Sequence, residues 1–193
     1  FGKASRIGGE LRSKLLQVIP YPSDIKMQTR LSSSILKWLR DNGTTNPDAA
    51  DHLPFVEGFQ FTEEGYTLAQ RFRVPLEVSN PSDGLVQMSL PAFTPSKSIF
   101  APRGTVSVVC DITAVNCVVA TASVAGSAST QLVFDYNDNL SAAQTISLPL
   151  PTPAGSLLVT AVSLKYRTAD KNGPQQIKAK GYMPAAIVSA MYL

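Results

Sequence analysis

The hydrophobic residues of this 193-residue chain follow two different periods, one in the first forty residues and another beyond about residue 55. In the first part they recur every three or four positions, which places side chains on one face of an α-helix. In the second part they recur at every second position, as in a strand with one buried face. The pattern therefore predicts a helical region followed by a sheet.

Two amphipathic helices are expected within residues 1–43. Proline has no amide hydrogen and restricts the residue before it, so Pro20 and Pro22 should end the first helix, and Asp24 is a suitable N-cap for the second. A short link between them favours an antiparallel hairpin with the later sheet as its packing partner. The predicted buried stripes are Ile7, Leu11, Leu15 and Val18, then Met27, Leu31, Ile35, Trp38 and Leu39.

Seven or more short strands are expected beyond the helices. Residues 68–78 alternate between apolar and polar, the stretch 80–84 has the composition of a turn, and alternation resumes over residues 86–90, which predicts a β-hairpin. Further alternating stretches occupy residues 106–113, 131–136, 146–150 and 175–183. Residues 157–166 are apolar on both faces over part of their length, which indicates a central strand.

The predicted fold class is mainly β: an antiparallel β-sandwich, Ig-like or jelly-roll-like, with an N-terminal α-helical hairpin. We expect one domain over residues 1–193, with the hairpin at 1–43 and the sandwich at 55–193, because this length suffices to bury a core without disulfides or metals. Short strands separated by Pro, Gly, Asn and Ser turns are typical of sandwiches and barrels. Strands do not alternate with helices, which disfavours a parallel α/β sheet.

The positive charge is concentrated in the helical region. Residues 1–43 hold eight of the seventeen Lys and Arg residues but only three of the fourteen Asp and Glu residues. Such a face attracts nucleic acid or anionic surfaces, yet charges on a helix are usually a solvated face, so nucleic acid is not the partner we expect. Residues 104–134 are nearly uncharged, but polar residues at almost every second position indicate a sheet and no membrane span.

Residues suited to catalysis or metal binding are few. His52 is the only histidine, and a Ser-His-Asp triad could be built on it with Asp51, but no Gly-x-Ser-x-Gly elbow is present, so an exposed loop histidine is expected. Residues 135–139 place oxygen ligands as in a calcium loop, but Leu140 and Ile146 stand where Gly and Glu are required. We therefore assign no catalytic, cofactor or metal residue and expect no cofactor.

Cys110 and Cys117 are the only two cysteines. A chain reversal near Asn116 would separate them, whereas a turn between Thr113 and Ala114 would bring them face to face. Free buried thiols are the favoured interpretation, since apolar cysteine is common in cores.

Aromatic and acidic residues suggest two carbohydrate-related alternatives. Phe59, Phe61, Tyr66 and Tyr136 could form a sugar-binding platform, although aromatics on strands are more often core residues. Adjacent Glu63 and Glu64 point apart on a turn, whereas glycoside hydrolysis needs carboxyl groups that face each other across a cleft.

Several short motifs resemble those of uncharacterised proteins of Bacteroidota, known chiefly as domains of unknown function. The resemblance covers scattered motifs over about the first 105 residues, implies a bacterial source and a helix-then-sheet layout, and carries no catalytic residue. The motifs are Phe-Gly-Lys-Ala-Ser at 1–5, Leu-Arg at 11–12, Gly-Phe-Gln-Phe at 58–61, Pro-Ala-Phe-Thr-Pro at 91–95 and Ala-Pro-Arg-Gly-Thr at 101–105.

The leading functional hypothesis is a structural or interaction module without catalytic activity. It would meet a protein partner or a second copy of itself through an edge strand or through the apolar C-terminus at 185–193. The alternatives are a carbohydrate-binding β-sandwich, a hydrolase that uses His52, and nucleic-acid binding through residues 1–43.

Overall fold

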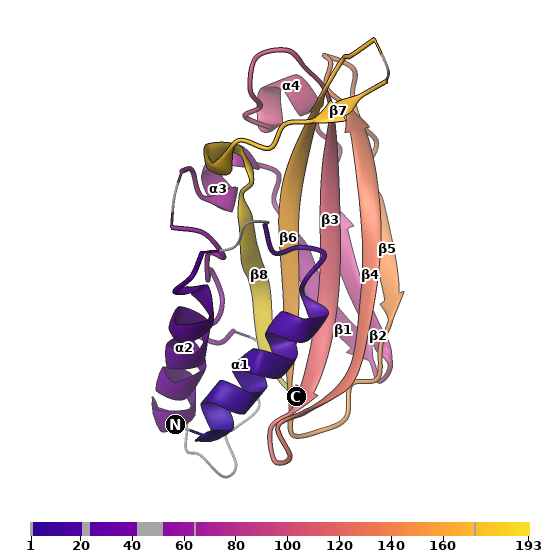
Figure 1. Ribbon diagram of the computed structural model, residues 1–193. Helices are drawn as coiled ribbons and strands as arrows, with labels where there is room; N and C mark the ends of the chain where they lie inside the picture. The colour runs from indigo at the N-terminus through magenta and orange to yellow at the C-terminus, as the bar shows by residue number, and fades with distance from the viewer. Residues whose placement is uncertain (1, 21–23, 42–51, 64, 172) are drawn as a thin grey trace.

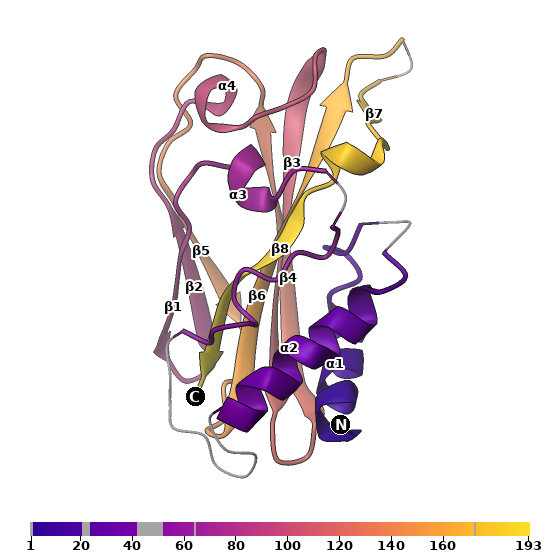
Figure 2. The ribbon, with the colours of Figure 1, turned by 90° about the vertical axis from the view of Figure 1, so that its left-hand side faces the viewer.

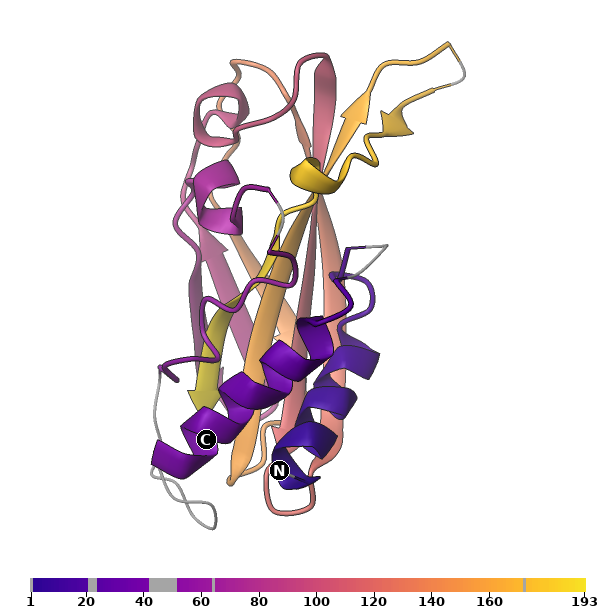
Figure 3. The same cartoon turned by 60° about the vertical axis from the view of Figure 1, so that its left-hand side comes forward.

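The computed structural model describes residues 2–20, 24–41, 52–63, 65–171 and 173–193. Strands account for 41% of the structure and helices for 22%, and all strand pairs are antiparallel. Two helices, α1 (Gly2–Lys14) and α2 (Met27–Asp41), come first in the chain. They lie side by side against one face of the larger sheet (Figure 1; Figure 3). The predicted mainly β fold with an N-terminal helical region is confirmed.

The two helices form within the segments that the apolar period predicted, because each has a stripe to bury. The predicted end of the first helix at Pro20 is wrong, because α1 ends at Lys14 and the rest of the stripe, Leu15 and Val18, lies in the turns that follow it. Every residue of the two predicted stripes is at most 2% exposed.

The backbone N–H of Lys26 donates to the Asp24 carboxylate at 2.9 Å, and the N–H of Met27 donates to the Asp24 carbonyl at 3.1 Å. Asp24 therefore closes the turn that leads into α2, but it lies three residues before Met27, where the helix begins, and not directly before the helix as the predicted N-cap would.

The described strands form two sheets. The smaller sheet has the order β1-β2-β5, and the larger has the order β4-β3-β6, with β7 and β8 both paired to the remaining edge of β6. The strand bounds are β1 (Glu77–Ser82), β2 (Leu85–Leu90), β3 (Thr105–Val118), β4 (Ser123–Asp135), β5 (Gln144–Pro149), β6 (Ser156–Thr168), β7 (Gln175–Gln176) and β8 (Ala185–Tyr192). Three short helices complete the fold: α3 (Leu68–Arg71), α4 (Pro95–Ser98) and the 3-10 helix η1 (Lys180–Tyr182).

The larger sheet is the middle of three layers, with the helices on one face and the smaller sheet on the other (Figure 2). On the helix side, Val115 and Val159 join the stripes of α1 and α2 in one apolar cluster. On the opposite side, Ile112 and Val162 join residues of β2 and β5 in a second cluster. Since β3 and β6 are buried on both faces, the predicted central position of residues 157–166 is confirmed.

The predicted hairpin on either side of residues 80–84 is present as β1 and β2, with Gly84 at a φ of 81° in the turn. The expectation of a strand from residue 68 is wrong, because residues 68–71 form α3. Thr67 and Gln70 form a capping box in which each side chain accepts the other's backbone N–H. The spacing of Leu68 and Phe72 fits an i, i+4 pair on a helix as well as the alternation of a strand. The apolar period alone therefore could not distinguish a helix from a strand at this place.

Three further expectations about the sheet are wrong. The alternation over residues 106–113 predicted Asp111 and Thr113 on a solvent-facing side of the strand, but both are fully buried. Lys165 and Gln131 contact the Asp111 carboxylate, and Lys165 also bonds Gln17 in the segment that follows α1. β3 continues to Val118, so the chain does not reverse near Asn116 or Thr113. The last strand is β8, whereas only two residues of the expected strand at 175–183 pair, as β7.

Candidate functional site

Strand β4 forms the outer edge of the larger sheet, and β3 is its only strand partner among the described residues. The N–H of Tyr136 donates to the carbonyl of Val106 at 2.9 Å, which identifies a hydrogen-bonded pair next to the β3–β4 ladder. Hydrogen-bonded and non-hydrogen-bonded pairs alternate in antiparallel sheets. The N–H and C=O groups that face away from β3 therefore belong to Ser127, Ser129, Gln131 and Val133.

The composition of this edge leaves it open to pairing. β4 is 13 residues long and contains neither proline nor lysine, and Asp135 is its only charged residue. Natural edge strands are usually guarded by charges, proline, bulges or short length, and the one irregularity here lies near Gly126, toward the start of the strand. No backbone hydrogen bond among the described residues joins β4 to β5, its neighbour in Figure 1.

The apolar C-terminus, the other expected interaction surface, is not available. It forms β8, which is buried along almost its whole length and pairs with β6 on one edge. On its other edge the N–H groups of Leu53, Gly58 and Phe61 donate to carbonyls of β8 at 2.9 to 3.1 Å. The expectation that residues 185–193 form an assembly surface is therefore wrong, because both edges of β8 already have partners.

A buried polar centre lies between β3, β4 and β6, and the sequence analysis missed it. Asp111 is fully buried, and its carboxylate lies 2.6 Å from Nζ of Lys165 on β6. The amide of Gln131 donates to the same carboxylate at 2.6 Å, and Lys165 Nζ also donates to the carbonyl of Gln17 at 3.4 Å. An acid within an otherwise apolar strand was the available signal. Because both of these contacts of Lys165 Nζ are with oxygen acceptors, the centre is better suited to positioning groups than to proton abstraction.

His52 lies on the surface, as predicted, with 81% of its side chain exposed. Its Nδ1 is 3.0 Å from a carboxylate oxygen of Glu57. Asp51, the expected triad partner, lies outside the described residues. The described geometry therefore gives His52 an acidic neighbour at the surface, where charge pairs are weak.

The calcium-like loop at residues 135–139 uses its polar side chains to form a turn. Asn137 accepts the N–H of Asn139 at 2.9 Å in an Asx turn, and the hydroxyl of Ser96 donates to the Asp138 carboxylate. The described residues contain no group of three or more His, Cys, Asp or Glu side chains arranged to hold a metal ion.

The four aromatic residues considered as a sugar platform do not share a face. Phe59 and Phe61 lie in the cluster below the helices, with ring centroids 5.6 Å apart. Tyr136 donates its hydroxyl to the carbonyl of Ile99 at 3.1 Å, and exposed Tyr66 stacks on the guanidinium of Arg71 at 4.0 Å. Of the paired acids, Glu63 is 3.2 Å from Arg30, and Glu64 lies outside the described residues.

Arg71 is a second buried charge that the sequence did not reveal. It is 6% exposed and lies between the rings of Tyr66 and Tyr182, at 4.0 and 4.8 Å from their centroids. Its Nη1 donates to the carbonyl of Phe100 at 3.0 Å. These contacts hold α3, η1 and the segment that follows α4 together, so we interpret the role of Arg71 as structural.

Both cysteines are buried free thiols, as predicted. Burial, with a smaller contribution from the Asp111 charge, raises the pKa of Cys110 to about 12. Burial, with a smaller contribution from Glu10, raises the pKa of Cys117 to about 11. The two side chains lie on opposite faces of β3, in the two different apolar clusters. Neither thiol is suited to nucleophilic chemistry.

The basic residues of α1 and α2 are mostly on solvated faces. Arg12, Lys14, Lys37 and Arg40 are exposed, whereas Arg30 is held by Asp24 at 2.8 Å. Among the described helices, none has the length and apolar character needed to cross a membrane.

No protein-family model matches the chain, and no curated protein matches it either.

Proposed function

We propose that this protein is an interaction module without catalytic activity, which takes up an extended strand of another polypeptide on the outer edge of β4. The observation that carries the proposal is the row of outward backbone groups from Ser127 to Val133, an uncharged stretch of the edge strand. Strand addition is a recurrent mode of recognition, in which main-chain hydrogen bonds give affinity and alternate side chains give specificity.

The expected free energies support a weak contact. Four outward residues offer about eight hydrogen bonds, each with a net contribution of about 1 kcal/mol because water already satisfies these groups. Association costs about 4 to 15 kcal/mol in lost freedom of motion. Backbone pairing alone therefore only balances that cost, and side-chain contacts near Val133 and Gln131, both exposed, must supply the remainder.

The surroundings of the potentially reactive side chains support the proposal that the module has no catalytic activity. Lys165 is engaged by Asp111, and His52 faces solvent beside Glu57. The two cysteines have raised pKa values because they are buried. A nucleophile with an adjacent base and a cavity for a substrate is the arrangement that acyl or glycosyl transfer requires.

A second copy of the chain is the first occupant to test, because every copy supplies the same uncharged stretch of strand and two such stretches can pair about a two-fold axis. Sedimentation velocity over a concentration series from 5 to 500 µM is expected to show reversible dimers. Val133, 54% exposed on the edge strand, is changed to Lys, and Leu140, 70% exposed on a loop, is changed to Lys as the matched control.

Val133→Lys should weaken association at least tenfold, since charge guards an edge strand, and Leu140→Lys should leave it unchanged. A chain that stays monomeric at 500 µM, or dimers that both variants weaken equally, would contradict self-pairing through β4.

A further inference from the structure

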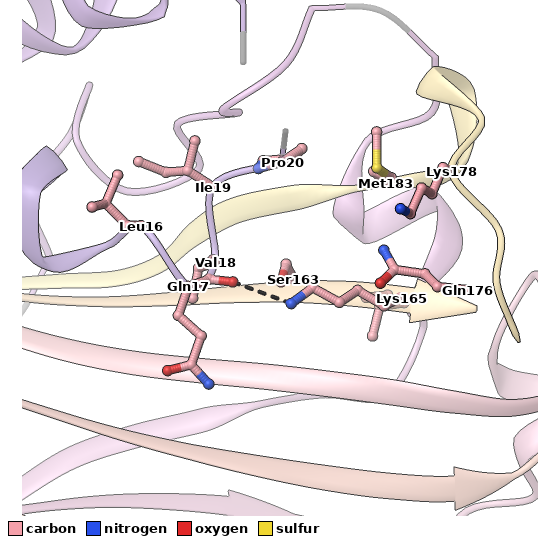
Figure 4. A pocket seen from close by; sticks show the side chains of 11 residues that line it. Leu16, Gln17, Val18, Ile19, Pro20, Ser163, Lys165, Gln176, Lys178 and Met183 are labelled. Atoms are coloured by element: carbon pink, nitrogen blue, oxygen red, sulfur yellow. Dashed lines mark hydrogen bonds between the residues drawn. The ribbon is translucent and has the colours of Figure 1, made fainter. Parts of the chain in front are cut away.

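A pocket of about 380 Å³ lies between the segment that follows α1, strand β6 and the chain around β7. Its volume is within the range of small-molecule sites and equals that of about a dozen water-sized groups. Leu16, Ile19 and Met183 give it an apolar wall (Figure 4). Leu16 is 64% exposed, so part of this wall remains in contact with solvent.

The polar wall of the pocket is rich in donors. Lys165 and Lys178 line it together with Gln176. The nitrogens of Lys178 and Gln176 lie near the chain around β7, whereas the Lys165 side chain extends along β6 toward the Gln17 carbonyl (Figure 4). The described lining contains no Asp or Glu. Asp111 lies behind Lys165 and compensates one of the two positive charges, so one net positive charge remains.

Ser163 provides an independent indication of a ligand. It lines the pocket, is 3% exposed, and its Oγ is buried without a hydrogen-bond partner among the described residues. A buried hydroxyl without a hydrogen-bond partner destabilises the fold unless an acceptor reaches it. Lys165 Nζ has three hydrogens and two partners among the described residues, the Asp111 carboxylate and the Gln17 carbonyl. One N–H is therefore also left for an acceptor.

We infer that this pocket binds a small organic carboxylate, with its anionic end at Ser163, Lys165 and Lys178 and its apolar part against Leu16, Ile19 and Met183. A carboxylate is an acceptor without donors, which matches a wall of donors, and its single charge matches the one uncompensated cation. This inference does not depend on strand addition at β4, which lies at the opposite edge of the sheet.

The test is a titration of the ¹⁵N-labelled full chain with sodium hexanoate, followed through backbone amide shifts at residues 163–165 and 176–178. We expect saturable shifts with a Kd on the order of 1 mM, which is typical for a ligand of this size. Hexanol, which has the same tail without the charge, and inorganic phosphate, which has the charge without the tail, should each bind at least tenfold more weakly.

Two variants and one control variant assign the site. Lys178→Glu should weaken hexanoate binding at least tenfold, whereas Lys97→Glu, the same charge change on exposed α4, should alter it less than twofold. Ser163→Ala should weaken binding several-fold while the fold is retained. Unsaturable shifts, equal binding of hexanol or phosphate, or equal effects of the two lysine variants would overturn the inference.

Discussion

Lys165 reaches Asp111 diagonally across the β3–β6 ladder, and its Nζ lies 2.6 Å from the fully buried carboxylate. The backbone of Lys165 faces Val109, and that of Asp111 faces Ser163. The ion pair therefore fixes the register of the two central strands on the helix side. It also places the ammonium at the floor of the carboxylate pocket proposed above.

Removing the lysine from this pair should destabilise the fold. Lys165→Met leaves the Asp111 carboxylate buried with only Gln131 as a donor, and such a loss costs about 3 kcal/mol of unfolding free energy. Urea denaturation monitored by circular dichroism measures the change.

The double variant Asp111→Asn with Lys165→Met is the control for this prediction. It removes both charges and should recover at least half of the loss, because no unpaired charge stays buried. A Lys165→Met protein as stable as the wild type would show that the pair contributes nothing to the fold.

The two thiols should be unreactive in the folded protein. A pKa of about 11 leaves roughly one thiolate in a thousand Cys117 residues at pH 8, and Cys110 has fewer still. Modification by Ellman's reagent should therefore proceed at the rate of unfolding and accelerate with urea in parallel with it. Rapid reaction of either cysteine at pH 8 without denaturant would contradict their burial.

The same thiols should make stability fall at alkaline pH. Their folded pKa values, about 12 for Cys110 and about 11 for Cys117, lie above the ordinary value of 9.0. The stabilising contribution is therefore complete below pH 9 and is lost as pH rises toward 11 and 12, by up to about 1.4 kcal/mol per pH unit for each thiol.

Unfolding free energies between pH 9 and 10.5 measure this slope. Cys117→Ala should flatten it by about 1 kcal/mol per pH unit relative to the wild type, since one titrating thiol is removed. Identical slopes in both proteins would show that Cys117 titrates alike in the folded and unfolded states.

Arg71 should be needed for stability in a way that lysine cannot replace. Its planar guanidinium stacks between Tyr66 and Tyr182 while donating to the Phe100 carbonyl. Arg71→Met and Arg71→Lys should each lower the unfolding free energy by about 2 kcal/mol.

Arg73→Met is the matched control, because Arg73 is exposed and its guanidinium lies over the half-exposed ring of Phe100. Its effect should stay within about 0.5 kcal/mol. Full stability of Arg71→Lys would mean that charge alone, and not the stacked geometry, holds this region.

The sequence predicted the helices well because their signal is local. Each stripe, such as Ile7 to Val18, lies within one short segment of the chain. The end of α1 at Lys14 was not predicted, because no proline or glycine marks it and Pro20 comes six residues later. The hairpin of β1 and β2 was equally local, because its turn residues lie between its own strands.

Long-range features were not predictable from the chain in the same way. Asp111 alternates with apolar neighbours as a solvent-facing residue would, and its burial depends on contacts with Lys165 on β6 and Gln131 on β4. Its partner Lys165 comes from a distant strand whose pairing depends on the whole sheet. Likewise, the composition of β4 did not indicate that it would lie at the edge, since edge position is a property of strand order.

Amide hydrogen exchange along β4 tests the central claim most directly. The N–H groups of Ala128, Thr130 and Leu132 face β3 and should be protected at every concentration. Those of Ser129 and Gln131 face outward and should exchange rapidly at 5 µM but become at least tenfold slower when the chain is concentrated to 500 µM. Exchange at Ser129 and Gln131 that stays equally fast at both concentrations would contradict strand pairing at this edge.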